Sequence, residues 1–160
     1  MNIFITDECP RKCAEALDDK RVIKMILESA QMLSTAIWER GGEGFYRSTH
    51  INHPCSKWVR ETKENYKWLF THFLHLCEEY QNRFSKEHKC LQYFKEMDDG
   101  YALVPEGKLT PFPNCSLFKD DLNVFHAYKK TLATKWANDK RPPKWTNSEP
   151  PSWVFIKNSS

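Results

Sequence analysis

Apolar residues recur at helical spacing in three long stretches, so the pattern predicts three long helices. The first spans residues 10–40 and ends at a glycine-rich turn. The second spans 54–84 and opens at a His-Pro step, which suits a first helical turn. The third spans 120–138, and a shorter helical piece covers 88–97. We therefore predict an all-α protein with no sheet larger than a short ribbon, forming a single domain over residues 1–160. The residues expected in its core include Leu33, Leu69, Phe73 and Leu76.

Both ends of the chain depart from this helical pattern. Residues 2–6, NIFIT, are apolar and extended, which predicts a buried arm or a short strand. Residues 98–117 are rich in proline and are expected to form a loop. Residues 139–160 hold four prolines and two tryptophans, too irregular for a helix and too aromatic for a solvated tail. We expect this irregular tail to pack on the body of the protein or on a ligand.

Composition narrows the classes of partner only slightly. Aromatic residues make up 14% of the chain, enough for a core and for surfaces on which nucleic-acid bases stack. The net charge of +3 permits nucleic-acid binding and excludes a histone-like cationic coat. Any phosphate-binding surface must therefore come from local clusters of cations.

The cysteines and the apolar segments indicate the compartment. The start of the chain lacks a signal-peptide pattern, and no segment has 18 consecutive apolar residues. We therefore expect no membrane span and a cytoplasmic location. If a phage encodes the protein, this location is the cytoplasm of the host cell. The six cysteines are then expected as reduced thiols. Cys9 and Cys13 make a poor zinc half-site, and His72 with His75 reads as the edge of a buried face. We expect neither a metal nor another cofactor.

One polar stripe on the first helix has the composition of an active-site wall. Lys20, Lys24, Glu28 and Gln31 fall within about 80° of one another around the helix axis. A lysine amine attacks carbon when it is deprotonated, and a neighbouring cation favours that state. A carboxylate beside it can move protons or stabilise a developing cation. The alternative is a solvated helix face with a Lys24–Glu28 pair.

Two further groups suit phosphate and bases. Thr49, His50 and His53 precede the second helix, and helix N-termini favour anions, although these residues also suit a simple turn and cap. Toward the C-terminus, cations are interleaved with tryptophans, a pattern typical of DNA contact but also of solvated lysines over buried aromatics. The members of this second group are Lys129, Lys130, Lys135, Trp136, Lys140, Arg141, Lys144 and Trp145.

Three motifs together resemble the pyrimidine-dimer DNA glycosylase family, of the phage endonuclease V type. They are LDDKR-x2-K-x3-E-x2-Q after a short leading arm, HPCSKWVRETKENYKWLF opening the second helix, and KRPPKW after the last helix. The resemblance covers most of the chain, is weakest at 98–117, and points to a divergent, phage-type branch. It implies a small all-α DNA repair enzyme whose leading arm threads into the core and whose aromatic tail lies near the DNA.

The resemblance also implies a mechanism. In the family an N-terminal amine attacks C1′ of the damaged nucleotide, a glutamate on the first helix assists, and the Schiff base allows strand cleavage by β-elimination. Here the glutamate would be Glu28. The chain begins Met1-Asn2, and Asn is too large for efficient removal of Met, so the nucleophile would be the Met1 amine, or else Lys20 or Lys24.

We therefore expect a DNA glycosylase, with AP lyase activity as a further expectation, that excises a damaged or modified pyrimidine base as a monomer. One alternative is a non-catalytic DNA- or nucleotide-binding phage accessory or counter-defence protein of the same fold, and another is a structural partner protein. The expected catalytic residues are Glu28, Lys24, Lys20 and Met1. The expected substrate contacts are Gln31 in the site wall, Arg21, His50 and His53 at phosphate, and Trp68, Lys140, Arg141 and Trp145 on DNA.

Overall fold

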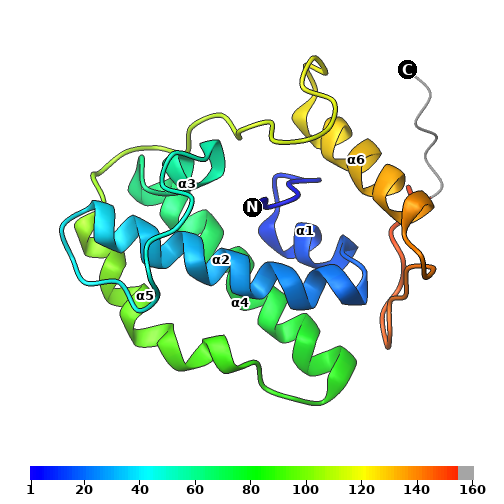
Figure 1. The fold of residues 1–160 in the computed structure, drawn as a ribbon, viewed down its shortest axis with the longest axis horizontal. Helices are drawn as coiled ribbons and strands as arrows, with labels where there is room; N and C mark the ends of the chain where they lie inside the picture. The colour runs from blue at the N-terminus through cyan, green and yellow to red at the C-terminus, as the bar shows by residue number, and fades with distance from the viewer. Residues whose placement is uncertain (155–160) are drawn as a thin grey trace.

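The computed structural model describes residues 1–154, and over that range the chain is helical without a strand (Figure 1). The predicted all-α class is thereby confirmed. The α-helices are α1 (Pro10–Ala16), α2 (Asp19–Glu39), α3 (Pro54–Val59), α4 (Lys63–Phe84), α5 (Phe94–Gly100) and α6 (Val124–Asn138), with 3-10 turns η1 (Lys89–Tyr93) and η2 (Tyr101–Leu103). None of the described helices is long and apolar enough to cross a membrane.

Helices α2 and α4 pack against each other along much of their lengths and form the centre of the molecule (Figure 1). Leu33 of α2 meets the α4 residues Leu69, Phe73 and Leu76 in one hydrophobic core, and all four are fully buried, as the apolar pattern predicted. Helix α1 lies on α4. The apolar faces of the helices therefore form most of the core, and the extended arm residues Ile3 and Ile5 complete it.

The helix expected over residues 10–40 is in fact two helices, α1 and α2. Leu17 and Asp18 are extended between them, with ψ angles of 139° and 163°. The Asp18 carboxylate is buried, and it accepts hydrogen bonds from the Arg21 guanidinium and from the indole Nε1 of Trp136, which is 118 residues away. A periodic sequence pattern does not reveal this break, because the donor that stabilises it lies on another helix.

The helix expected over residues 54–84 is also divided, into α3 and α4. Helix α3 ends at Val59, and Thr62 caps α4 by accepting from the Asn65 amide at 3.1 Å. The Lys63 amide donates to the Pro105 carbonyl oxygen at 2.9 Å, so a distant loop binds the first turn of α4. The last helix is shorter than expected, because Asn123 caps α6 and residues 120–123 lie outside it.

The proline-rich stretch after η2 is a long loop that crosses from α3 and α4 to α6 (Figure 1). Thr110 exchanges hydrogen bonds with the Asn65 side chain on α4. Further along, the Tyr128 hydroxyl on α6 donates to the Pro113 carbonyl oxygen and accepts from the Cys115 amide. The part of this loop around Cys115 is thus fixed against α6, although it has no regular structure.

The leading arm is buried as an extended segment and forms no strand. Ile3 and Ile5 are fully buried, and the Phe4 ring meets the Tyr128 ring edge to face at 6.5 Å. At the other end of the chain, the Trp145 indole donates to the Ala16 carbonyl oxygen at 3.0 Å, and Trp153 stacks on Trp136. The described part of the irregular tail thus contacts the body of the protein. Residues 155–160 of that predicted tail lie outside the described residues.

Candidate active site

The amino terminus meets a carboxylate of helix α2. The α-amine of Met1 lies 3.5 Å from Glu28 Oε1, and the Asn2 amide donates to the same oxygen at 3.0 Å. The Met1 side chain is only 2% exposed and that of Glu28 is 14% exposed. The amine and the carboxylate are thus held together at a partly buried place, since Met1 and Glu28 are each half-buried as whole residues.

Asn2 holds the first residue of the arm in this position. Its Oδ1 accepts from the amides of Ile3 and Phe4, and its Nδ2 donates to the Cys115 carbonyl oxygen at 3.3 Å. Phe4 has a φ of 60°, in the left-handed region that bulky residues rarely adopt. Such strain persists only when the surroundings determine it, and here the buried arm and the Asn2 side chain do so.

His53, Cys55 and Cys115 form a polar group next to the amino terminus. Burial lowers the pKa of His53, and the positive charge of the Met1 amine lowers it further. The Cys55 thiol donates to Cys115 Sγ at 3.3 Å. That hydrogen bond lowers the pKa of Cys115 to about 7 and, together with burial, raises the pKa of Cys55. The site therefore contains a neutral imidazole and an unusually acidic thiol.

The remaining members of the predicted polar stripe do not all meet the arm. Lys20 is eight residues before Glu28, about 12 Å along the helix axis. Its side chain is 70% exposed and lies 4.0 Å from Asp139. Lys24 is exposed and Gln31 is half-buried. Of the four residues, Glu28 alone has a polar contact with the described arm.

Two residues expected to contact DNA are instead buried. The Arg21 guanidinium donates to Asp139 at 2.9 Å and to Asp18 at 3.3 Å, and these carboxylates raise its pKa against the effect of burial. Arg21 therefore joins α2 to the end of α6 and is not presented to a phosphate. Trp68 packs against Trp58 and His72, and its indole donates to the Glu8 carbonyl oxygen, so its ring is not free to stack on a base.

His50 and His53 differ in their surroundings, although both precede α3. His50 is exposed, with a φ of 50°, and its Nδ1 pairs with the Thr49 hydroxyl at 2.9 Å. His53 is half-buried and caps α3, since its Nδ1 accepts from the Cys55 amide at 3.1 Å. Of the two roles expected for these histidines, His53 has that of a helix cap. His50 is exposed and remains available to bind a phosphate.

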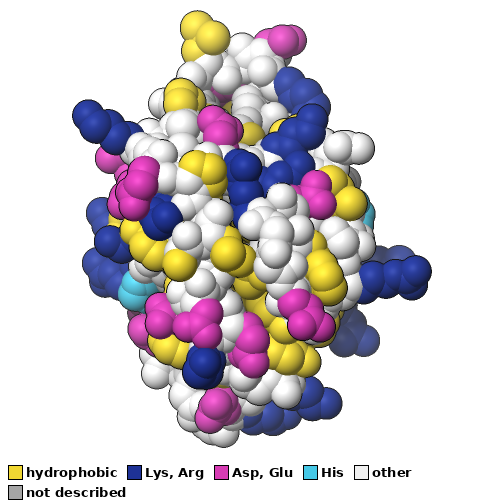
Figure 2. Space-filling view, turned by 90° about the vertical axis from the view of Figure 1, so that its left-hand side faces the viewer, with side chains coloured by type: hydrophobic (Ala, Val, Ile, Leu, Met, Phe, Trp, Pro, Cys, Tyr) yellow, Lys and Arg dark blue, Asp and Glu magenta, His cyan; other side chains and the backbone are white. Residues whose placement is uncertain are grey.

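Cations gather around a cleft between the start of α2 and the segment that follows α6. This cationic cleft has a volume of about 640 Å³ and is lined by Lys20, Lys140, Arg141 and Lys144 together with Asp18, Asp19 and Asp139. Trp145 is half-buried beside it and meets Trp136 edge to face. On the face at the left of Figure 1, basic and acidic side chains are also intermixed (Figure 2).

Sequence patterns did not single out Asn2, Cys55 or Cys115. The Asn2 side chain reaches another segment through its hydrogen bond to the Cys115 carbonyl oxygen, and Cys55 and Cys115 are 60 residues apart. The only sequence signals were an amide next to the chain start and a cysteine after the His-Pro step. Neither residue type has a spacing that predicts its neighbours.

A comparison with protein families agrees with the first two of the three motifs. A family model described as pyrimidine dimer DNA glycosylase matches residues 1–92, more than half of the 160-residue chain. This region includes the arm and helices α1 to α4, and so both Met1 and Glu28. No curated protein and no solved structure matches the chain. The chain therefore belongs to the pyrimidine dimer DNA glycosylase family.

Proposed function

We propose that this protein excises a damaged pyrimidine from DNA and that its nucleophile is the α-amine of Met1. The observation that carries the proposal is the 3.5 Å contact between this amine and Glu28 Oε1. Membership of a family described as pyrimidine dimer DNA glycosylase supports a dimerised pyrimidine as the substrate.

In the proposed reaction the amine nitrogen attacks C1′ of the damaged nucleotide. The bond between C1′ and the base nitrogen breaks, and the base leaves with the bonding electrons. Glu28 accepts the proton that the amine loses and stabilises the positive charge that develops at C1′. Opening of the sugar ring then produces a Schiff base between Met1 and C1′, and loss of a proton from C2′ breaks the bond from C3′ to the phosphate oxygen.

The two lysine alternatives have less geometric support. Lys20 is strongly exposed and pairs with Asp139, and Lys24 is exposed on the same helix. A lysine nucleophile gains reactivity from burial or from a nearby cation, and an exposed side chain has little of the first. We therefore assign these lysines, with Lys140, Arg141 and Lys144, to binding of the DNA backbone. His50, Gln31 and Trp145 are proposed as further contacts at the edges of the site.

Borohydride trapping tests the proposal directly. The protein is mixed with duplex DNA that carries one cyclobutane pyrimidine dimer, or one abasic site, and the Schiff base is reduced to a stable adduct. Proteolysis and mass spectrometry then locate the DNA remnant. We expect it on the N-terminal peptide, and we expect N-terminal acetylation to prevent the adduct. An adduct on Lys20 or Lys24 would assign the nucleophile differently. DNA binding without any adduct would favour the non-catalytic binding protein.

A further inference from the structure

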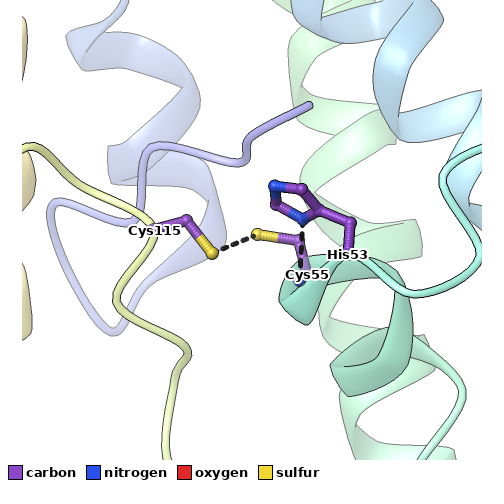
Figure 3. A group of neighbouring side chains, drawn as sticks. All are labelled: His53, Cys55 and Cys115. Carbon is purple, nitrogen blue, oxygen red and sulfur yellow. Dashed lines mark hydrogen bonds between the residues drawn. The ribbon is translucent and has the colours of Figure 1, made fainter.

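We propose that His53, Cys55 and Cys115 form a zinc-binding site beside the amino terminus. One imidazole nitrogen and two sulfur atoms lie within 4.8 Å of one another. They come from two separate segments: His53 and Cys55 from the start of α3, and Cys115 from the loop before α6 (Figure 3). The fold thus assembles a group of metal-ligand residues that no local sequence motif contains.

The donor atoms suit zinc. Two thiolates and one imidazole are a common zinc ligand set, and three protein ligands leave a fourth tetrahedral position for water. Zn–S bonds of about 2.3 Å and Zn–N bonds of about 2.0 Å place ligand atoms roughly 3.5–3.8 Å apart in a tetrahedron. The observed Sγ–Sγ distance is 3.3 Å. Small side-chain rotations therefore suffice to admit the ion, and both thiols release their protons as it binds.

Binding of the ion removes the hydrogen bond between the two thiols and the proton of the buried Cys55, and it also removes one hydrogen bond of His53. His53 Nδ1 accepts from the Cys55 amide at 3.1 Å. A metal on Nδ1 takes over that lone pair, and a metal on Nε2 moves the ring proton to Nδ1, so either mode removes this cap. One N-cap hydrogen bond is a small loss compared with coordination of zinc by two thiolates.

The ligands are held in place before any ion arrives. Cys55 is fully buried in the first turn of α3. The Cys115 amide donates to the Tyr128 hydroxyl, and its carbonyl oxygen accepts from Asn2. A zinc ion would therefore join the loop before α6 to α3 directly beneath the arm. Because a preformed site binds the folded chain only, the ion would also stabilise the fold.

Cobalt(II) is the probe that tests the site, since tetrahedral thiolate coordination gives it visible d–d bands and a thiolate charge-transfer band. The full chain, kept reduced with a phosphine, is titrated with cobalt(II) and then with zinc(II). We expect saturation at one equivalent and loss of the bands when zinc displaces cobalt. Cys55→Ser, Cys115→Ser and His53→Asn should each weaken binding at least tenfold, and Asn at position 53 retains a cap for α3.

Cys9→Ser is the matched control, because Cys9 is half-buried like Cys115 and lies outside the group. It should bind cobalt as the wild type does. Alkylation of the wild-type protein provides a second measurement that needs no variant: zinc should protect the half-buried Cys115 from iodoacetamide and leave Cys9 unprotected. Absent bands, bands that survive Cys115→Ser, or alkylation that zinc does not change would each overturn the proposal. No readout involves DNA, so the result is independent of the proposed catalysis.

Discussion

The Met1 amine and the Asn2 amide share one acceptor, Oε1 of Glu28, at 3.5 Å and 3.0 Å. One carboxylate oxygen therefore both holds the backbone of the arm and faces the group proposed to attack DNA. The placement of the arm and the proposed reactivity of the Met1 amine thus depend on the same carboxylate. Substitution of Glu28 is expected to report on the catalytic role of the carboxylate, and substitution of Asn2 on the placement of the amine.

Glu28→Gln should abolish base release while leaving the fold and DNA binding nearly intact. The amide oxygen of Gln can still accept from Asn2, but it carries no charge and does not take a proton. Removing a general base or charge stabiliser typically costs about 10²- to 10⁴-fold in rate. Single-turnover cleavage of the C1′–base bond in dimer-containing DNA, read as alkali-labile strand breaks at the dimer, measures the effect, because the freed base stays joined to its partner pyrimidine. Glu39→Gln, at the exposed end of the same helix, is the control. Wild-type rates for Glu28→Gln would show that its charge has no catalytic role.

Asn2→Leu should slow formation of the trapped adduct by roughly 10- to 100-fold, because misplacing a reacting group by about 1 Å can cost that much. Leu has the size of Asn but loses the hydrogen bonds to Ile3, Phe4 and Cys115. Like Asn, it is too large to promote removal of Met1, which intact-mass measurement verifies. Quench-flow trapping at several DNA concentrations gives the rate. An unchanged rate would mean that the Asn2 side chain does not position the amine.

DNA binding should weaken steeply with salt and should depend on the cationic cleft. Each phosphate contact contributes about 0.9 to the slope of log affinity against log salt. Replacing Lys140 and Arg141 by Gln should therefore reduce the slope by about 1–2. Fluorescence anisotropy of a labelled duplex at several salt concentrations measures it. Lys95 and Lys108, which are exposed far from the cleft, are the paired control. Equal slopes for the two double variants would show that the cationic cleft is not part of the surface that binds DNA.

Acid should destabilise the fold through His72. Burial lowers the pKa of His72 to about 4, from an ordinary value of 6.5. Between these values the unfolded chain binds a proton that the folded chain does not, so stability falls as the pH drops from about 6.5 to about 4 and is fully present above that window. A difference of this size corresponds to about 3 kcal/mol. Urea unfolding across the window measures it, and His72→Phe should flatten the dependence. A slope that persists in His72→Phe would assign it to other groups.

Trp136→Phe should destabilise the protein by about 1–3 kcal/mol, because it leaves the buried Asp18 carboxylate without its indole donor. The donor distance is 2.8 Å, and Asp18 is only 2% exposed. Trp153→Phe is the matched control, since Trp153 contributes a ring stacked on Trp136. Chemical unfolding gives both free energies. If the two variants lose the same stability, ring packing and not the hydrogen bond explains the loss.

The class of the fold and much of its core were predictable from the sequence. Helical spacing of apolar residues is a local property, and burial of a helix face follows from it. The fully buried Leu33, Leu69 and Phe73 were predicted on that basis. The apolar arm was likewise expected to be buried, because exposure of its apolar side chains to water is unfavourable. The motifs of the first and second predicted helices also indicate the family.

Only the tertiary structure decided where the helices break and what surrounds the amino terminus. The break at Asp18 depends on Trp136, and the start of α4 depends on Pro105. The arm reaches Glu28 because Asn2 turns its backbone against the loop at Cys115. Each of these interactions joins residues far apart in the chain. Periodicity reports which face of an element is apolar, but it does not report which distant donor or acceptor meets that face, so the helix ends and the polar contacts of the site required the fold itself.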